Sequence, residues 1–300
     1  MNTKINLAGV ELKNPVMTAS GTFGSGMEYS EFVDLNKLGA VVTKGVANVP
    51  WSGNPTPRIA ETYGGMINAI GLQNPGIDVF CERDIPFLKK YDTKIIVNVC
   101  GKSERDYVEV VERLAGEPVD MLEINISCPN VKEGGIAFGQ NAANIEHITK
   151  AIKNVAKQPV IMKLSPNVTD ITEMAKAAEA GGADVLSLIN TITGMKIDIN
   201  RQTFAVANKT GGLSGPAVKP VAVRMVYQVA NAVKIPIIGM GGIATAEDAL
   251  EFILAGATAV SIGTANFHNP RTTLEVIEGI EKYMVNKGVS DINDLIGIVK

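Results

Sequence analysis

The sequence predicts an α/β fold, a (β/α)8 TIM barrel with an N-terminal hairpin and inserted loops. First, short runs of β-branched residues alternate with helical segments about eight times, which is the pattern of parallel βαβ units. Second, almost every run ends in a polar residue or a glycine, and barrels of this kind build their sites at the carboxyl ends of strands. Third, 300 residues with 46% hydrophobic residues and 30 glycines suit one large core with many tight turns.

The alternative fold is a doubly wound open sheet, and the length alone would also allow two ordinary domains. An open sheet of that kind wants a glycine fingerprint directly after its first strand. Residues 20–24, Ser-Gly-Thr-Phe-Gly, match that fingerprint poorly. The barrel is therefore the preferred prediction.

The expected elements follow in chain order. A hairpin over residues 5–12 precedes the barrel, because apolar positions alternate loosely around Ala8 and Gly9. The barrel strands are apolar segments that stop at a polar residue or glycine: 15–19, 40–43, 94–97, 119–126, 159–162, 184–189, 236–238 and 258–262. Helices are expected to begin near Glu28, Ile77, Ser103, Asn141, Asp170 and Thr245, with another ending near Val233 and a final helical region at the end of the chain.

Two polar insertions interrupt this alternation. The first covers residues 47–75 and contains Trp51 and the segment Asn-Ala-Ile-Gly-Leu at 68–72. The second follows the strand that ends at Ile189 and runs through the glycine-rich segment 209–216. Long loops inside a compact barrel are usually functional, so both insertions are expected to serve a site.

Composition excludes several classes of partner. The formal net charge is -3 and Lys and Arg form no block, so neither nucleic acid nor a membrane is expected as a partner. Residues 1–7 lack the apolar core of a signal peptide, which predicts a cytoplasmic location. Cys81, Cys100 and Cys128 show no Cys-x-x-Cys spacing, so no disulfide framework and no metal site is expected in this chain.

The most distinctive stretch is Glu-Ile-Asn-Ile-Ser-Cys-Pro-Asn at residues 123–130, followed by Gly-Gly-Ile-Ala-Phe-Gly at 134–139. A buried strand ends here, because Pro129 has no N–H to donate to a sheet. Asn125 and Cys128 are therefore presented at the carboxyl end of a strand. A buried structural cysteine is the other interpretation, and the flanking polar residues leave the two readings about even.

The strand ends together predict a site at one rim. They are Ser20, Lys44, Asn98, Asn125 with Cys128, Lys163, Asn190 with Thr191, Gly241 with Gly242, and Gly263 with Thr264. A solvated surface position would explain any one of them, but not their coincidence around the whole barrel. Two lysines and three asparagines suit a flat heteroaromatic ligand together with a small carboxylated one.

The last two strand ends indicate a phosphate site. Glycine backbones approach a ligand closely, and the helices that follow should aim free N–H groups at an anion. Glycines that merely make tight turns are the alternative. No Walker-type lysine follows, which argues against a nucleotide triphosphate. His147 falls in a predicted helix and His268 in a predicted late loop, so Cys128 is the best candidate for proton transfer.

Several motifs carry a resemblance to one family. They are 68–72, 125–130, 163–167, 211–215, 239–242 and 263–266. Together they resemble the dihydroorotate dehydrogenases over essentially the whole chain, and the NAD-linked class 1B in particular. The resemblance implies that residues 1–300 form a single FMN-binding TIM-barrel domain with inserted substrate loops. It implies an oxidoreductase that converts (S)-dihydroorotate to orotate in de novo pyrimidine (UMP) biosynthesis, with FMN as the hydride acceptor.

The same resemblance implies roles for individual residues. Cys128 matches the base that takes a proton from substrate C5, while Lys163 would stabilise negative charge near flavin N1. The residues that resemble FMN contacts are Ser20, Lys44, Gly45, Asn98, Asn125, Lys163, Ile189, Gly215, Gly241, Gly242, Gly263 and Thr264. Those that resemble substrate contacts are Lys44, Asn68, Ala69, Ile70, Gly71, Leu72, Asn125, Asn190 and Thr191.

The resemblance also implies an assembly. A cysteine base is similar to class 1 enzymes, and residues 134–139 and 163–166 are similar to class 1B. Such proteins pair with a subunit that carries FAD and a [2Fe-2S] cluster and passes electrons to NAD, in a heterotetramer built on a dimer of catalytic subunits. The alternatives are a fumarate-linked class 1A enzyme, a flavoenzyme for another dihydropyrimidine, and a non-catalytic flavin- or phosphate-binding barrel.

Overall fold

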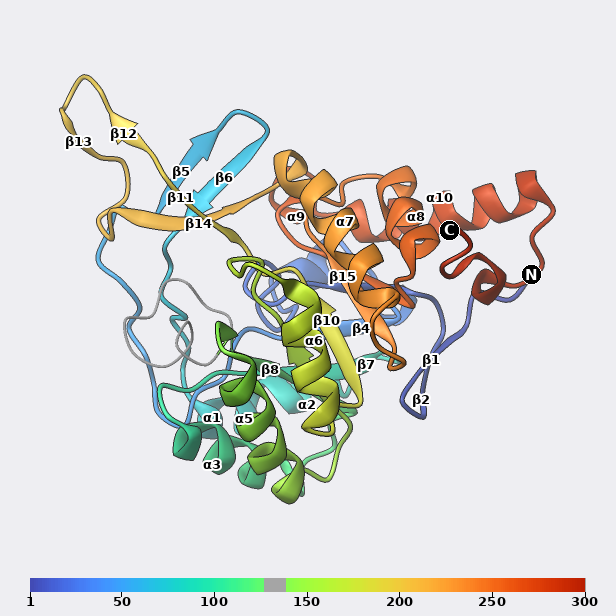
Figure 1. Cartoon of the computed structure of the whole chain (residues 1–300), viewed down its shortest axis with the longest axis horizontal. Coiled ribbons are helices and arrows are strands. Elements are labelled where there is room, and N and C mark those ends of the chain that lie inside the picture. The colour runs from blue at the N-terminus through green and yellow to red at the C-terminus, as the bar shows by residue number, and fades with distance from the viewer. Residues whose placement is uncertain (127–138, 300) are drawn as a thin grey trace.

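The computed structural model describes residues 1–126 and 139–299 (Figure 1). In this part of the chain a parallel barrel closes with its strands in chain order around the ring, and the last strand pairs with the first. The strands are β3 (Val16–Thr18), β4 (Ala40–Val42), β7 (Lys94–Val99), β8 (Met121–Asn125), β9 (Val160–Lys163), β10 (Val185–Leu188), β15 (Ile237–Met240) and β16 (Ala259–Ile262). The predicted (β/α)8 barrel is confirmed, and the open-sheet alternative is wrong.

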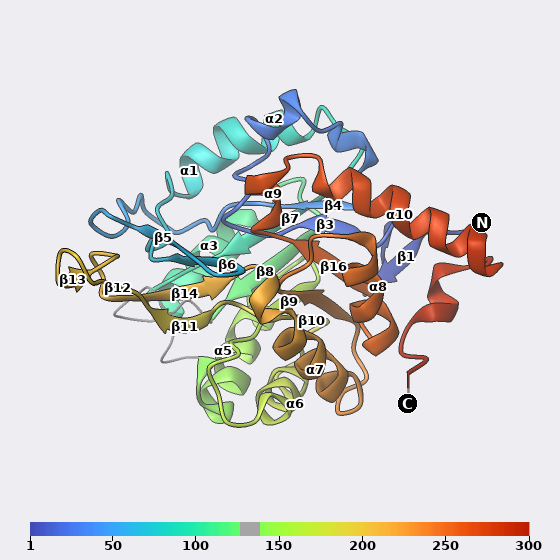
Figure 2. The same cartoon turned by 90° about the horizontal axis from the view of Figure 1, so that it is seen from above.

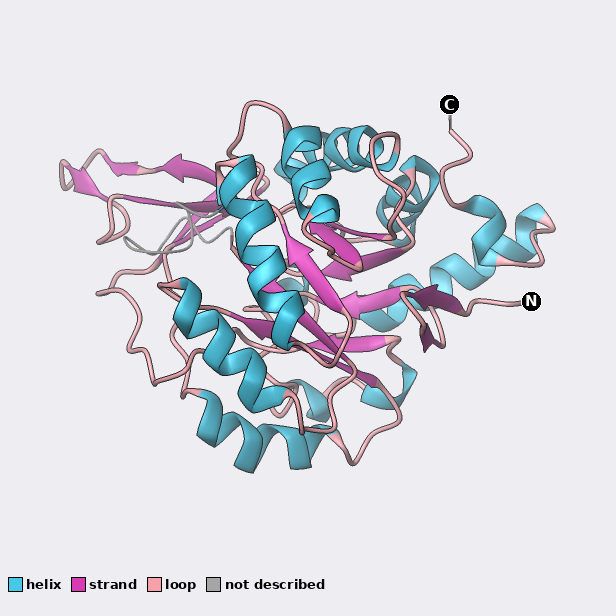
Figure 3. Cartoon of the chain, turned by 60° about the horizontal axis from the view of Figure 1, so that its bottom comes forward, coloured by secondary structure: helices cyan, strands magenta, loops and turns pink. Residues whose placement is uncertain are grey.

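Helices surround the strands, which are buried on both faces, as the run of apolar β-branched residues requires. Figure 3 shows the strands in magenta enclosed by helices in cyan. The long helices are α3 (Glu104–Leu114), α5 (Ala142–Val155), α6 (Ile171–Ala180), α7 (Lys219–Ala230), α8 (Ala246–Ala255) and α10 (Thr272–Lys287). Each follows a barrel strand, so that the carboxyl ends of the strands share one rim.

Most predicted helix starts are confirmed, and side-chain caps explain them. Ser103 and Thr245 each form a capping box, in which the side chain accepts from the N–H three residues on and an aspartate there accepts in return. Asn141 and Asp170 accept from the backbone of the first turns of α5 and α6. The polar residues at the start of these helices therefore accept hydrogen bonds from N–H groups that have no acceptor within the helix.

The helix expected from Glu28 is wrong. The segment forms two 3-10 turns, η1 (Tyr29–Glu31) and η2 (Leu35–Lys37). The side chain of Asp34 accepts a hydrogen bond from the N–H of Asn36 and starts the second turn separately, so no continuous α-helix forms.

Two further helical segments differ from expectation. The helix expected from Ile77 is divided into α1 (Ile77–Val79), the π-helical η3 (Phe80–Asp84) and α2 (Ile85–Leu88). Pro86 lacks an N–H, so the regular ladder is interrupted where η3 meets α2. His268 lies in the short helix α9 (Ala265–His268), so its predicted place in a late loop is wrong.

The N-terminal hairpin is confirmed as β1 (Ile5–Leu7) and β2 (Val10–Leu12). Ile5, Leu7 and Leu12 are buried in the main core. Near the other end of the chain, η4 (Pro216–Val218) precedes α7 and η5 (Ile292–Leu295) follows α10. Within the described residues, no helix combines the length and apolar character needed to cross a membrane.

The two insertions form one sheet, which we call the roof. The first contributes β5 (Ile59–Thr62) and β6 (Gly65–Asn68); the second contributes β11 (Ile192–Met195) and β14 (Thr210–Ser214). Their order is β11-β14-β6-β5, so strands from both insertions pair at the centre. A separate pair, β12 (Ile197–Asp198) and β13 (Thr203–Phe204), lies farther out. Figure 2 shows the roof projecting on the side opposite the chain termini.

Candidate active site

A cavity of about 1090 Å³ opens between the carboxyl rim of the barrel and the roof. Most sequence-predicted site residues line it. They are Ser20, Lys44, Gly45, Asn68, Ile70, Gly71, Leu72, Asn125, Lys163, Ile189, Asn190, Thr191, Gly215, Gly241, Gly242, Gly263 and Thr264. A volume of this size is above the usual range for small-molecule pockets, so it has room for more than one ligand.

Among the described residues, two of the predicted site residues do not line the cavity. Ala69 is 1% exposed and packs under the roof against Ile67 and Val206. Asn98 is completely buried one layer below the rim, where it supports Asn125. Cys128 lies outside the described residues, as do 127–138 as a whole.

Lys163 is held at the floor of the cavity. It ends β9, is 4% exposed, and donates from Nζ to Ser20 Oγ at 3.3 Å. Its Nζ also lies 3.8 Å from Glu123 Oε2, a carboxylate that is 1% exposed. A buried ammonium of this kind needs a carboxylate nearby, and Glu123 provides it.

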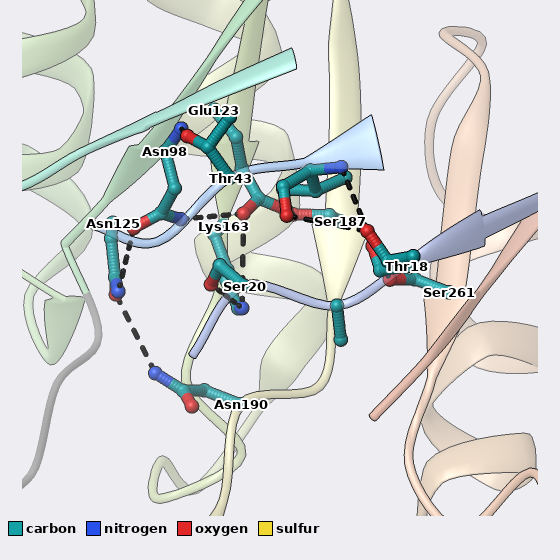
Figure 4. Close-up of polar contacts among 12 residues, drawn as sticks. Thr18, Ser20, Thr43, Asn98, Glu123, Asn125, Lys163, Ser187, Asn190 and Ser261 are labelled. Carbon is teal, nitrogen blue, oxygen red and sulfur yellow. Dashed lines mark hydrogen bonds and ion pairs between the residues drawn. The ribbon is translucent and has the colours of Figure 1, made fainter. Parts of the chain in front are cut away.

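The asparagines form a chain that runs from the barrel interior up to the cavity (Figure 4). Asn190 Nδ2 donates to Asn125 Oδ1 at 3.5 Å, and Asn125 Nδ2 donates to Asn98 Oδ1 at 3.4 Å. Asn98 Nδ2 then donates to Glu123 Oε2 at 2.5 Å. The Glu123 carboxylate accepts at the end of the chain that lies deepest in the barrel. It therefore orients the three amides between itself and the cavity. Tyr107 fixes the backbone as well, donating to the Asn125 carbonyl at 2.8 Å.

Lys44 lines the cavity just after β4, the strand that pairs with β7. Its backbone N–H donates to Gly24 O at 2.9 Å, which ties the end of β4 to the loop after β3. A Cβ on Gly21 would lie 3.7 Å from Lys44 Nζ, so the ammonium lies against the backbone of that loop. The loop is anchored in turn by Ser25, which donates to the buried Asp84 at 2.7 Å.

Four glycines, Gly215, Gly241, Gly242 and Gly263, form the feature that we call the glycine cradle. The first three have φ angles of +106°, +127° and +82°, where only glycine is unstrained. A Cβ on Gly242 would lie 2.8 Å from Gly215 O and 2.9 Å from Lys219 Cβ. The loops after β14 and β15 therefore pack backbone to backbone, which no other residue would permit.

The cradle offers backbone donors. Within the described residues, no group accepts a hydrogen bond from the N–H of Gly242, Ile243, Gly263 or Thr264. These residues line the same cavity, and Thr264 Oγ1 donates to Ser214 Oγ at 2.8 Å across it. Several N–H groups on adjoining loops are a ready receptor for an anion.

The N-terminus of α8 is capped by its own side chains. Its capping box occupies the first turn, and Asp248 Oδ2 accepts from the N–H groups of Ala244 and Thr245 at 2.9 Å each. Burial acts to raise the pKa of Asp248, but the Lys219 ammonium and these N–H groups outweigh it and hold the pKa below its usual value.

The segment 68–72, here called the strap, lines the cavity with every residue except Ala69. Gly71 and Leu72 have φ angles of +75° and +55°. Arg58 braces the neighbouring chain, donating to Asn54 O at 2.6 Å, Ser52 O at 2.9 Å and Gln73 Oε1 at 2.5 Å. The strap is thus a braced turn and not a free loop.

Sequence reasoning missed two groups. Glu123 sits inside an otherwise apolar strand, and that placement was the signal, because a carboxylate there must be paired. Thr62 lines the cavity from the roof, and its buried hydroxyl has no hydrogen-bond partner among the described residues. Within 1–126 and 139–299, no three His, Cys, Asp or Glu side chains cluster to hold a metal ion.

Known proteins similar to this chain share one family name. The family model described as Dihydroorotate dehydrogenase matches residues 2–284. The protein named Dihydroorotate dehydrogenase B (NAD(+)), catalytic subunit, from Lachnoclostridium phytofermentans is 76% identical over 300 residues, which cover 100% of both chains. The protein of the same name from Alkaliphilus oremlandii is 67% identical over 296 residues, covering 99% of this chain and 98% of the relative.

A solved structure agrees with these relatives. The crystal structure of DHODH from Eimeria tenella in complex with ferulenol superimposes with a TM-score of 0.83 at 25% sequence identity. The match covers 99% of this chain and 88% of that one. The likeness therefore extends over the whole barrel.

Proposed function

This chain belongs to the dihydroorotate dehydrogenase family of oxidoreductases, and from that premise we propose that it oxidises (S)-dihydroorotate to orotate in pyrimidine biosynthesis, with bound FMN as hydride acceptor. The carrying observation is the rim cavity, which combines two lysines, a chain of asparagines and a glycine cradle. We propose further that residues 1–300 act as one FMN-binding domain. The relatives' shared name supports the NAD-linked class B form.

The residues present fit a flavin mononucleotide. One end of the cavity offers the unbonded N–H groups of the glycine cradle, which suit a phosphate. The other end offers the buried Lys163 and the asparagine chain, which suit a flat ring with imide-like donors and acceptors. A cavity of about 1090 Å³ leaves space beside the ring for a small carboxylated substrate.

When bound, FMN would supply a two-electron acceptor for the hydride on substrate C6. Lys163, which is 4% exposed, would hold a cation where negative charge develops during that transfer. Asn125, Asn190 and the strap orient the substrate, and Lys44 binds at the junction of substrate and cofactor. These assignments of contacts are proposals, supported by the place of each residue on one cavity wall.

We assign the removal of the proton from substrate C5 to Cys128, acting as the base. This residue lies outside the described residues, and the proposal rests on the motif at 125–130 and on the position of Asn125 at the end of β8. A thiol ordinarily titrates near about 8.5, so the reaction is expected to quicken as pH rises through that region.

We propose that a second subunit receives the electrons. The relatives are named as catalytic subunits, which implies a partner. An FAD and a [2Fe-2S] cluster on that partner, passing electrons to NAD, and a heterotetramer around a dimer of this chain, complete the proposal. A cytoplasmic location stays a prediction from the sequence.

Anaerobic addition of dihydroorotate to the purified, FMN-loaded protein tests the proposal. Flavin absorbance near about 450 nm should bleach, and neither NAD nor fumarate should restore it without the partner subunit. Rapid recovery with fumarate would instead identify a class 1A enzyme. Absence of bleaching would refute the proposed substrate, and a panel that includes dihydrouracil would then identify another dihydropyrimidine or a non-catalytic barrel.

A further inference from the structure

Glu123 is the least accessible charged group in the site. It lies in β8, two residues before Asn125, and is 1% exposed in the barrel interior. Moving a carboxylate from water into such a place costs several kcal/mol unless it is paired and hydrogen-bonded, on the order of a whole domain's spare stability. A smaller apolar residue would fill a barrel layer without that cost. The carboxylate therefore needs an account beyond packing.

Its contacts come from three neighbouring strands (Figure 4). Oε1 accepts from Ser187 Oγ on β10 at 2.8 Å, and Oε2 accepts from Asn98 Nδ2 on β7 at 2.5 Å. The Lys163 ammonium on β9 lies 3.8 Å from Oε2. Through these contacts the carboxylate holds Lys163, which lines the cavity, and Asn98, which supports the cavity residue Asn125.

We propose that Glu123 is a positioning residue that orients Asn98 and Lys163 and offsets the charge of Lys163, so that the pair sets the balance between oxidised and reduced flavin. The inference rests on the proposed function, because it requires a bound flavin. It adds a role for a group that touches neither ligand.

The effect of Glu123 on the flavin is electrostatic. Lys163 alone would favour the reduced, more negative cofactor strongly, because charges in a buried site are weakly screened. A carboxylate at 3.8 Å cancels much of that field while keeping the ammonium in place. A cofactor held too firmly in its reduced form would not pass its electrons on. Glu123 thus limits how strongly the site favours the reduced flavin.

A purely structural role predicts something different. In that case Glu123 matters only for folding, and replacing it with a residue of the same shape leaves the redox balance unchanged. Glutamine is that residue, because its Oε1 still accepts from Asn98 and its amide donates to Ser187, whose hydroxyl can rotate. Ser187→Ala is the matched control, since it removes one hydrogen bond to the carboxylate and no charge.

The experiment measures the midpoint potential of bound FMN in wild type, Glu123→Gln and Ser187→Ala by anaerobic spectroelectrochemical titration. Glu123→Gln should favour reduced over oxidised flavin at least tenfold relative to wild type, which for a two-electron couple is a rise of about 30 mV. Ser187→Ala should change the ratio less than threefold. A Glu123→Gln value within threefold of wild type, or a shift the other way, overturns the proposal.

A charge cycle keeps the test decisive if Glu123→Gln does not fold. Lys163→Gln should disfavour reduced flavin at least tenfold, and the double variant Glu123→Gln/Lys163→Gln should lie at least tenfold above Lys163→Gln alone. The double variant leaves no unpaired buried charge, so it is the better candidate to fold. Equal ratios in Lys163→Gln and the double variant refute the proposal.

The two proposals fail separately. If wild type does not bleach with dihydroorotate, the proposed function fails and this inference fails with it. If wild type bleaches while the charge cycle shows no coupling, only the role of Glu123 is refuted.

Discussion

The two sides of the cavity present different groups, side chains on one side and backbone on the other. From β7 to β10 the wall is made of side chains, with Lys163, Glu123 and the asparagine chain bonded to one another. From β14 to β16 the wall is made of backbone, with the glycine cradle and its unbonded N–H groups. Under the proposed function, the first side would adjust charge and hydrogen bonding at the flavin ring, whereas the second would bind the phosphate through backbone N–H groups. We expect substitutions on the first side to change rates and potentials, and those on the second to change cofactor affinity.

The largest expected effect concerns the proposed base, Cys128, which lies outside the described residues. Cys128→Ala should bind FMN normally but lose about 10²- to 10⁴-fold in the rate of flavin bleaching by dihydroorotate, because a general base contributes that much. Cys128→Ser should fall between, with its optimum displaced to higher pH. Stopped-flow reduction across pH 6 to 10 measures both. Bleaching by Cys128→Ala at the wild-type rate would refute the assignment of Cys128 as the base.

The backbone wall should respond in binding. Gly242→Ala places a Cβ 2.8 Å from Gly215 O at a φ of +82°, a strain of about 1–3 kcal/mol that should weaken FMN about tenfold to a hundredfold. Fluorescence titration of the apoprotein with FMN measures the dissociation constant. Gly116→Ala is the control, because nothing lies within 4 Å of its Cβ. Equal affinities for the two variants would show that the cradle does not hold the cofactor.

The strap should give a smaller effect that separates substrate from cofactor. Arg58→Leu removes three braces from the chain around residues 68–72, so the KM for dihydroorotate should rise about tenfold while FMN affinity stays the same. Steady-state kinetics with an artificial acceptor measures the change. A fall in kcat at unaltered KM would contradict this role.

The smallest effect lies behind the cradle. The pKa of Asp248 is lowered from its ordinary value of 3.8. Its ion pair with Lys219 therefore stabilises the folded state fully at pH values above 3.8, and this stabilisation is lost as the pH falls through the lowered pKa. Lys219→Met should therefore cost about 1 kcal/mol near pH 7, and the difference from wild type should shrink below pH 3.8. Urea unfolding at both pH values measures it. A cost that is the same at both would assign the effect to lost packing.

The barrel and its rim could be predicted because their signals are local. A strand that stops at Lys44 or Lys163 announces its carboxyl end within a few residues, and helix caps such as Asp170 do the same. The pairing of Glu123 could not be predicted, because its partners lie on three other strands and only closure of the barrel brings them together.

Two other features differ from the prediction for separate reasons. Ala69 belongs to the predicted strap, but the roof buries it, so a residue inside a binding motif points away from the cavity. The segment after Glu28 has helical composition, yet the side chain of Asp34 divides it into two turns. The first feature depends on tertiary packing, whereas the second depends on a local hydrogen bond between a side chain and the backbone two residues on.

The roof also has a consequence for the order in which the molecule assembles. Asn68 and Gly212, which pair at its centre, are 144 positions apart in the chain. Closing a loop of that length carries a large entropy cost, and the barrel must bring β4 and β10 near each other before that pairing is favourable. We therefore expect amides of β6 and β14 to exchange with deuterium faster than those of β8 and β9, since the roof can open while the barrel stays closed. The enzyme's mouth would then be the last part to form and the first to loosen, which places conformational freedom where ligands enter.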